Sequence, residues 1–165
     1  MAGRWAELSE KIGSRTSAII IQIGTDLEAG RQLMRPLRIP HTVDWVNKLD
    51  LVELVALLEL ADVYVGIESG PLHIATTIGV PSIGLFGPTL APLFLHPRGS
   101  TKVIAGSSKC IGCHHSLTGP IHWRTGCPNN IVCMEEITTE QVLDAVLECL
   151  EPIDVRQQQA AREIC

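Results

Sequence analysis

The segment from Gly66 to Thr89 reads GIESGPLHIATTIGVPSIGLFGPT and contains the residues best suited to bind a ligand. Its first half joins an apolar run to a helix-like run through Glu68, Ser69, Gly70 and Pro71. Glycine at such a turn lets a ligand approach the backbone, and proline presets the first helical turn, where its missing N–H costs nothing. A helix N-terminus offers free N–H groups and the positive end of the helix dipole. The turn therefore predicts an anion site suited to phosphate.

Three side chains of this turn carry groups that a ligand can use. Ser69 offers a hydroxyl donor, and His73 in the first helical turn offers a hydrogen bond or a partial charge. Glu68 has the opposite sign, and suits either sugar hydroxyls or the backbone N–H groups of the turn itself. The alternative interpretation is a tight turn with a helix cap and a packing histidine, because a Gly-Pro turn on its own is a weak signal.

A second turn of the same kind follows the apolar run SIGLF and consists of Gly87, Pro88 and Thr89. Ligands of open parallel sheets gather at the carboxyl ends of the strands. Two Gly-Pro turns that end adjacent strands line one crevice, which favours the functional interpretation of both.

Four of the six cysteines gather in one short stretch, at Cys110, Cys113, Cys127 and Cys133, with His114, His115 and His122 close in sequence. A C-x-x-C pair closes a tight chelate turn, and two further sulfurs complete a tetrahedral structural site for zinc or iron. Reduced thiols and disulfides remain open as alternatives. Cys149 and Cys165 lie outside this cluster, and we expect no part in the site for either.

The elements that must position these residues alternate along the chain. Apolar runs predict strands at 18–23, 42–46, 63–67, 82–86 and 101–105, the first of them central and buried, and helical patterns cover 26–37, 51–60, 71–79 and the stretch after Thr138. Asp50 with Glu53, and Thr138 with Gln141, form capping boxes. The helix after Asp50 places Leu51, Leu54, Val55 and Leu58 on one face. This alternation predicts an α/β protein with a parallel, doubly wound, Rossmann-like sheet. Residues 106–132 have no apolar periodicity and predict a loop or small module.

Composition agrees with this class and excludes others. The chain of 165 residues is 45% hydrophobic but only 4% aromatic, as buried aliphatic strands flanked by helices require. A net charge of -5 without a run of basic residues argues against nucleic acid. No stretch has the length and apolarity of a signal peptide or a transmembrane segment, so we expect a cytoplasmic protein.

The residues ESGPLHIA, followed by GVPSIGLFGPT, resemble the donor-binding signature of glycosyltransferase family 9, the heptosyltransferases. The resemblance implies the GT-B architecture of two Rossmann-like halves, with residues 1–150 as the donor half, a Cys-rich insertion at about 106–134 and a tail at 151–165. It implies transfer of heptose from ADP-heptose to lipopolysaccharide core or to protein, without a metal, at or near the inner membrane. The cysteine cluster resembles the Cys-rich module that precedes the last helix in many members of this family, including an iron-binding finger in the protein-modifying branch.

The resemblance also assigns residues to the donor site. It implies that Ser69, Gly70, Pro71 and His73 hold the diphosphate, and that Gly87 to Thr89 form a second loop of the cleft. Two positions depart from the family pattern, because Glu68 replaces an Asp and Gly3 replaces a common phosphate-binding Lys. Arg4 is then the nearby cation, and we include it in the donor site.

The family's acceptor half, its catalytic carboxylate and the first donor-side strand have no counterpart in these residues. We therefore predict no catalytic residue here, and expect the chain by itself to be inactive as a transferase, since activation of an acceptor hydroxyl needs a positioned base. An exposed sheet edge predicts either an acceptor-domain partner or self-association. The alternative hypothesis is a non-catalytic module that keeps the fold and binds a metal or a partner.

Other candidates for ligand contact have simpler explanations. Trp5, Trp45 and Trp123 are able to stack on adenine, but packing explains each of them as well. Asp26 and Glu28 follow a strand end and suit ribose hydroxyls, but helix capping by Asp26 is the simpler account.

Overall fold

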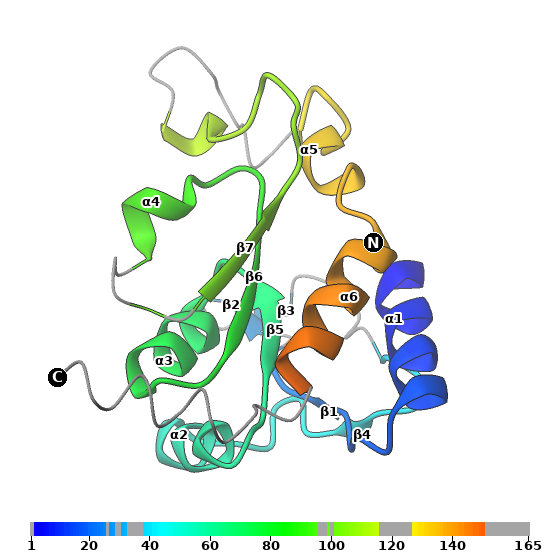
Figure 1. Cartoon of the computed structure of the whole chain (residues 1–165). Helices are drawn as coiled ribbons and strands as arrows, with labels where there is room; N and C mark the ends of the chain where they lie inside the picture. The colour runs from blue at the N-terminus through cyan, green and yellow to red at the C-terminus, as the bar shows by residue number, and fades with distance from the viewer. Residues whose placement is uncertain are drawn as a thin grey trace, which may run out of the picture.

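A parallel three-stranded sheet lies at the centre of the molecule (Figure 1). The computed structural model describes residues 2–25, 27–28, 31–32, 38–95, 99, 101–115 and 127–150. The central sheet has the order β5 (Tyr64–Ile67), β6 (Ser82–Phe86) and β7 (Thr101–Ala105). Two shorter sheets accompany it, namely β1 (Ile21–Gln22) parallel to β4 (Val43–Asp44), and β2 (Leu27–Glu28) antiparallel to β3 (Arg31–Gln32).

Helices cover both faces of the central sheet. They are α1 (Ala2–Arg15), α2 (Leu51–Glu59), α3 (Gly70–Ile78), α4 (Ala91–Phe94), α5 (Val132–Glu135) and α6 (Thr139–Leu150), with a 3-10 turn at Cys113–His115. In Figure 1, α2 and α3 lie on one side of the sheet, and α6 and α1 lie on the other. Within the described residues, no helix is both long and apolar enough to cross a membrane.

The strands alternate their side chains between these two helical layers. Ile83 and Leu85 of β6 belong to the same cluster as Leu143 and Val146 of α6. On the opposite face, Phe86 packs with Leu72 of α3. All five residues of β6 are buried, as expected for a central parallel strand with both faces covered.

The polar ends of the helices follow the predicted capping chemistry. The Asp50 side chain accepts from the Glu53 N–H at 2.8 Å, and the Glu53 carboxylate accepts from the Asp50 N–H at 2.9 Å. Thr138 and Gln141 form the corresponding pair before α6, at 2.8 and 3.2 Å. Both predicted capping boxes are confirmed, because a local four-residue pattern satisfies its own backbone groups.

Three predictions about local structure were wrong. Leu27–Glu28 and Arg31–Gln32 pair as short antiparallel strands, not as a helix over 26–37, and the sequence places Gly30 between them, a poor helix former. The rest of that predicted helix lies outside the described residues. The apolar run 18–23 forms only the two-residue β1, with Ile21 37% exposed, and is not a buried central strand. Leu51 is 67% exposed although its pattern predicted burial, because the first turn of α2 extends beyond the core.

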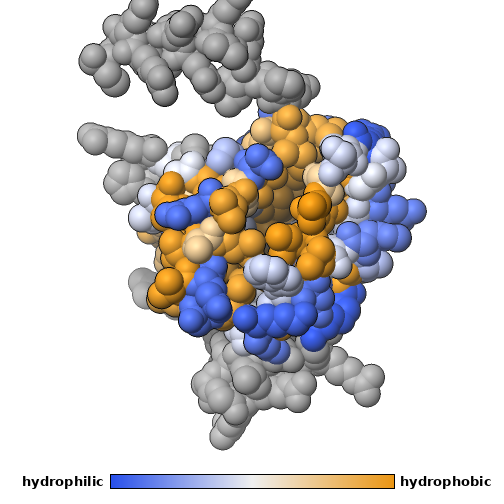
Figure 2. All heavy atoms as spheres, turned by 90° about the horizontal axis from the view of Figure 1, so that it is seen from below, coloured by the Kyte–Doolittle hydropathy of each residue, from blue (hydrophilic) through white to orange (hydrophobic). Residues whose placement is uncertain are grey.

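The predicted doubly wound sheet is present only in part. Among the described residues, the strands form three separate hydrogen-bonded sheets, not one continuous sheet. The elements β1, β4 and α2 lie at the lower end of Figure 1. Exposed apolar side chains on these elements or next to them in sequence are Ile19, Ile21, Val43, Leu51, Val52 and Leu60. Figure 2, which views the molecule from below, shows apolar side chains around a hollow.

The contact between α3 and β6 gives a direct test of the fold. Leu72 is fully buried, and a Cβ placed on Gly84 of β6 would lie 3.1 Å from its Cδ2 atom. We expect Leu72→Ala to lower the free energy of unfolding by about 2–5 kcal/mol, from lost burial and the cavity left behind. Chemical denaturation measures this. Leu60→Ala is the control, since Leu60 is 83% exposed and its loss is expected to change stability by less than about 0.5 kcal/mol. Equal effects of the two changes would contradict the packing described.

Candidate functional site

The turn after β5 has the geometry of an open helix N-terminus. Ser69 is the N-cap residue of α3 in extended conformation, and Pro71 lies in the first turn. The Ser69 hydroxyl donates to the Ile67 carbonyl at 3.2 Å and makes no capping bond to the helix. A Cβ placed on Gly70 would meet nothing within 4 Å. The first turn of α3 therefore has open space at its backbone, which suits an anion.

Glu68 and His73 form a pair across this turn. The His73 Nε2 atom lies 3.0 Å from the Glu68 Oε1 atom, and both side chains are partly exposed. An ionised carboxylate only accepts hydrogen bonds, so Nε2 donates and Nδ1 is the ring atom left to contact a ligand. The longer carboxylate at position 68 thus fixes the orientation of the histidine ring.

The Tyr64 side chain contacts the turn at Gly66 and Ser69, a role that the sequence analysis did not predict. Its side chain lies over Gly66, where an added Cβ would be 2.3 Å from the hydroxyl oxygen. Burial raises the pKa of Tyr64, and a hydrogen bond with the Ser69 side chain acts in the opposite direction. A residue at 66 without a side chain therefore lets the tyrosine hydroxyl reach the N-cap. The only sequence signal was a glycine inside a strand.

A row of rings extends from His73 toward the Cys-rich segment, by which we mean residues 106–134. The centre of the Phe94 ring on α4 lies 6.5 Å from that of His73 and 5.2 Å from that of His115. Phe94 is 40% exposed. Sequence reasoning missed this row, because its members belong to three separate elements and follow no spacing pattern.

The second predicted turn lies at the same sheet edge as the first, because β6 pairs in parallel with β5. Its backbone, however, binds the Cys-rich segment. The Gly87 carbonyl accepts from the Gly112 N–H at 2.8 Å, and the Pro88 carbonyl accepts from the His114 N–H at 3.0 Å. Thr89 is only 9% exposed. These contacts give the turn a structural role, and a donor contact by its residues stays a prediction.

Arg4 is also engaged by the protein itself. Its guanidinium donates to the carbonyls of Met134, Ile137 and Glu135, each at 2.9 Å, and pairs with the Glu135 carboxylate. These are carbonyls at and beyond the end of α5, which a cation stabilises. Arg4 therefore links α1 to the backbone of α5 and the residues that follow it. Phosphate binding by Arg4 stays a prediction.

The four clustered cysteines lie in one neighbourhood. Burial raises the pKa of Cys113 and of Cys133, and the charges of neighbouring cysteines raise both further. All four are free thiols in the structure. Within the described parts of the chain, no three His, Cys, Asp or Glu side chains come together as a set that would hold a metal ion. The donor type fits zinc or iron, but the ligand geometry is not preformed.

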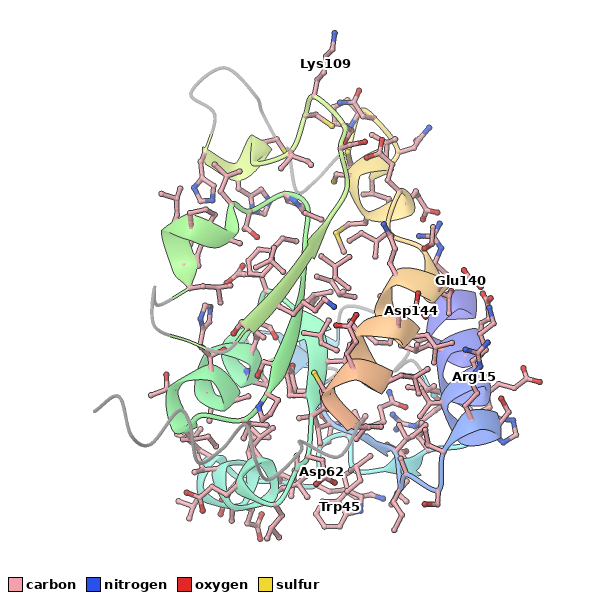
Figure 3. All side chains as sticks on the ribbon, viewed as in Figure 1. Arg15, Trp45, Asp62, Lys109, Glu140 and Asp144 are labelled. Atoms are coloured by element: carbon pink, nitrogen blue, oxygen red, sulfur yellow. The ribbon has the colours of Figure 1, made fainter. Side chains whose placement is uncertain are left out.

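The remaining candidates lie away from the turn or outside the description. Trp45 lies at the lower end of the molecule, whereas Lys109 in the Cys-rich segment marks the upper end (Figure 3). Trp5 packs against the cluster between the sheet and α6. Trp123, His122, Asp26 and Cys165 lie outside the described residues, and Glu28 is described in its backbone alone as part of β2.

A site at the carboxyl ends of parallel strands, beside an open helix N-terminus, is typical of nucleotide-binding α/β proteins. The model of glycosyltransferase family 9, the heptosyltransferases, matches residues 2–118. The chain belongs to this family. The lipopolysaccharide heptosyltransferase 3 of Escherichia coli is 26% identical over 89 residues, which are 52% of this chain and 26% of that protein.

Solved structures of the family share the fold. A family 9 glycosyltransferase from Veillonella parvula has a TM-score of 0.63 at 21% identity, over 91% of this chain and 41% of that chain. The iron-containing dodecameric glycosyltransferase TibC of enterotoxigenic E. coli has a TM-score of 0.67 at 21% identity, over 88% of this chain and 39% of TibC. TibC has also been solved in complex with ADP-D-β-D-heptose. The chain thus spans about two-fifths of the length of these structures, consistent with one half of the family's fold.

The two glycines Gly70 and Gly87 differ in the space around them. A Cβ on Gly87 would lie 2.6 Å from the Met134 Sδ atom and 2.9 Å from the Cys133 Sγ atom, whereas one on Gly70 meets nothing. We expect Gly87→Ala to destabilise the protein by about 1–3 kcal/mol, because overpacking displaces both sulfurs. Gly70→Ala is the matched control and should leave the melting temperature nearly unchanged. Thermal denaturation checks the pair, and a larger loss at Gly70 would contradict this division.

Proposed function

We propose that this chain is the donor-binding half of a heptosyltransferase and that it binds a nucleotide-activated sugar of the ADP-heptose type. The observation that carries the proposal is the open N-terminus of α3, with Gly70 unobstructed and the Glu68–His73 pair beside it. Membership of glycosyltransferase family 9 supports the choice of ligand. The solved complex of TibC with ADP-D-β-D-heptose, a protein of the same fold, supports it further.

Each part of the turn has a role in this proposal. The diphosphate accepts a hydrogen bond from the Gly70 N–H, because the Leu72 and His73 N–H groups already donate to the Ser69 carbonyl. It accepts a second from the Ser69 hydroxyl, which turns from the Ile67 carbonyl to the ligand. His73, oriented by Glu68 through Nε2, presents Nδ1, which donates to a phosphate oxygen when the ring is protonated. The partly exposed Glu68 carboxylate retains capacity to accept from a sugar hydroxyl.

The ring of Phe94 supplies a surface for the base. It is partly exposed and contacts the rings of His73 and His115. An aromatic face stacks on a purine without needing a hydrogen-bond pattern. The base then lies over α4, and the diphosphate points to α3.

The reacting sugar and its acceptor need groups that the described residues do not place at this turn. We assign no catalytic residue to the chain and expect the chain by itself to transfer no sugar, because a base within reach of the acceptor hydroxyl is required. The chain spans only 41% of the Veillonella structure, which leaves room for an acceptor half supplied by another polypeptide or by a further part of this protein. The acceptor, lipopolysaccharide core or protein, belongs to that half.

A second candidate function is a non-catalytic module that keeps the fold and binds a metal or a partner. It is favoured by the engagement of Arg4 with the 134–137 backbone and of Gly87 with the Cys-rich segment. The donor hypothesis predicted that Arg4 and Gly87 contact the nucleotide-sugar. Donor binding separates the two functions.

We expect ADP and ADP-heptose to raise the melting temperature of the chain. A ligand at 100 times its dissociation constant stabilises by about 2.7 kcal/mol. Differential scanning fluorimetry and calorimetric titration measure the effect. Glu68→Gln and His73→Ala should weaken binding by about 1–2 kcal/mol each, through loss of a charge-assisted hydrogen bond.

The control for these variants is Glu59→Gln, an exposed carboxylate at the end of α2. It should leave both stability and binding unchanged. No shift with either nucleotide, in a protein with an intact unfolding transition, favours the second candidate. Transfer of labelled heptose by the chain without a partner would contradict the expected inactivity.

For the Cys-rich segment we propose a structural zinc or iron site formed by Cys110, Cys113, Cys127 and Cys133. The mutual effect of these thiols on the pKa of Cys113 and Cys133 supports their proximity. TibC, of the same fold, contains iron. A bound metal would supply cross-links to a segment that has little core of its own. The transfer reaction is not assigned a metal.

The metal proposal predicts about one metal ion per chain in protein purified without chelator, measured by inductively coupled plasma mass spectrometry. The double variant Cys110→Ser and Cys113→Ser should lose the metal, since thiolates are the ligands. Cys149→Ser is the control, because Cys149 lies on α6 among the core residues and should have no effect on the metal content. Metal content near zero in the unmodified chain would refute the proposal and leave reduced thiols or disulfides as the alternatives.

A further inference from the structure

The Tyr64 side chain extends along one face of β5 toward the turn that follows this strand. Residues 64 and 66 point to the same face, and a Cβ placed on Gly66 would lie 2.3 Å from the Tyr64 hydroxyl oxygen and 2.8 Å from its Cζ atom. The ring packs against the buried clusters of Leu58 and of Leu72. Tyr64 therefore has its apolar ring in the core and its hydroxyl at the carboxyl half of β5.

The Tyr64 hydroxyl has the Ser69 side chain as its hydrogen-bond partner. Burial raises the pKa of Tyr64, and the hydrogen bond with Ser69 lowers it. A phenol, with an ordinary pKa of about 10, gives up its proton more readily than an aliphatic alcohol, so Tyr64 donates and the Ser69 Oγ atom accepts. Ser69 is the N-cap residue of α3, but its side chain makes no capping bond to the helix. The helix therefore does not hold the Ser69 hydroxyl.

The proton of Ser69 has a weak partner in the chain alone. A serine hydroxyl has one proton, and Tyr64 occupies one of its two lone pairs. The Ser69 proton goes to the Ile67 carbonyl at an oxygen-to-oxygen distance of 3.2 Å. Hydrogen bonds between oxygens are usually about 2.5–3.0 Å long, so this bond is weak, and a charged acceptor forms a shorter and stronger one. A phosphate oxygen beside the unobstructed Gly70 is such an acceptor.

We propose that Tyr64 is a positioning residue of the donor site: its hydroxyl donates to the Ser69 Oγ atom and so directs the Ser69 proton to a phosphate oxygen of the nucleotide-sugar. This inference rests on the proposed function, in which Ser69 binds the diphosphate. Tyr64 acts through Ser69 and has no ligand contact of its own. Consecutive hydrogen bonds polarise one another, so the bond from Tyr64 makes Ser69 a stronger donor to an anion.

Calorimetric titration of the full chain with ADP tests this role. Tyr64→Phe keeps the ring and its packing but removes the bond to Ser69, and it should weaken ADP binding about three- to tenfold, the equivalent of one hydrogen bond. Ser69→Ala should weaken binding by at least as much. In the double variant, Tyr64→Phe should add less than about a twofold loss, because no Ser69 hydroxyl is left to act through. If Tyr64 only supported the fold, the two losses would multiply.

Thr76→Val is the matched control. The Thr76 hydroxyl also shares a hydrogen bond with a second side-chain hydroxyl, that of Thr101, at 2.8 Å between the two oxygens. Thr76 lies near the carboxyl end of α3, the end opposite the Ser69 turn. The change removes a hydroxyl from a similar pair and should leave ADP affinity unchanged. Thermal denaturation checks that every variant is folded.

Nuclear magnetic resonance observes the Tyr64 ring directly. Tyr64 is the only tyrosine in the sequence, so tyrosine isotope-labelled at Cζ gives one signal. We expect saturating ADP to shift this signal in the unmodified chain, because the Ser69 proton turns from the Ile67 carbonyl to the phosphate and alters the bond from Tyr64. The shift should be clearly smaller in Ser69→Ala at saturating ADP.

Three results would overturn the role of Tyr64 while the unmodified chain binds ADP. The first is unchanged ADP affinity in Tyr64→Phe. The second is losses that multiply in the double variant. The third is a loss of affinity in Thr76→Val equal to that in Tyr64→Phe, which makes the effect a general one of removing a hydroxyl. Absence of ADP binding by the unmodified chain is a different failure. It overturns the donor proposal and this inference with it, and it is seen before any variant is made.

Discussion

A strand inside an α/β layer needs helices over both of its faces and hydrogen-bond partners at both of its edges, since an unpaired buried backbone group costs as much as a lost hydrogen bond. This chain meets the first need at β6, which is buried along its length between α3 and α6. It meets the second only within each sheet, because no described strand lies between β1 and β5. The separation of the described strands into three sheets and the 37% exposure of Ile21 in β1 agree with this constraint.

The parallel pairing of β5 and β6 also explains why the two predicted ligand turns lie close together. The carboxyl ends of β5 and β6 are adjacent because the two strands pair in parallel. The turns that follow them, although separated in the chain by α3 and β6, therefore lie at the same edge of the sheet. The turns then differ in what they contact. The first leaves the backbone of Gly70 open and holds His73 through Glu68, while the second is bonded to the Cys-rich segment through Gly87 and Pro88. The Cys-rich segment is in turn held by Glu136, which accepts from the Ser108 N–H at 2.8 Å, and α1 is tied to α5 by Arg4. The first turn leaves the backbone of Gly70 unobstructed, and the second is bonded to the Cys-rich segment.

Local signals in the sequence were sufficient where a few neighbouring residues satisfy their own backbone. The capping boxes at Asp50 and Thr138, the strand SIGLF and the helix that starts beside Pro71 were all predicted. The helix predicted over 26–37 was wrong at Leu27–Glu28 and Arg31–Gln32, which form paired strands. The apolar run at 18–23 forms only a short, partly exposed strand. A strand's burial depends on its neighbours, and periodicity in one segment carries no information about whether a neighbour is present.

The sequence by itself determined the α/β class, the family signature and the residues of the first turn, because each depends on short-range chemistry: apolar alternation, a Gly-Pro helix start and a cluster of cysteines. Only the tertiary structure decided what those residues contact. It bonded Arg4 to the carbonyls near α5, packed Gly87 against the sulfurs of Cys133 and Met134, and brought Phe94 and His115 beside His73. These contacts join residues that are distant in the chain. They arise from the packing of whole elements, and no spacing within a single element encodes them.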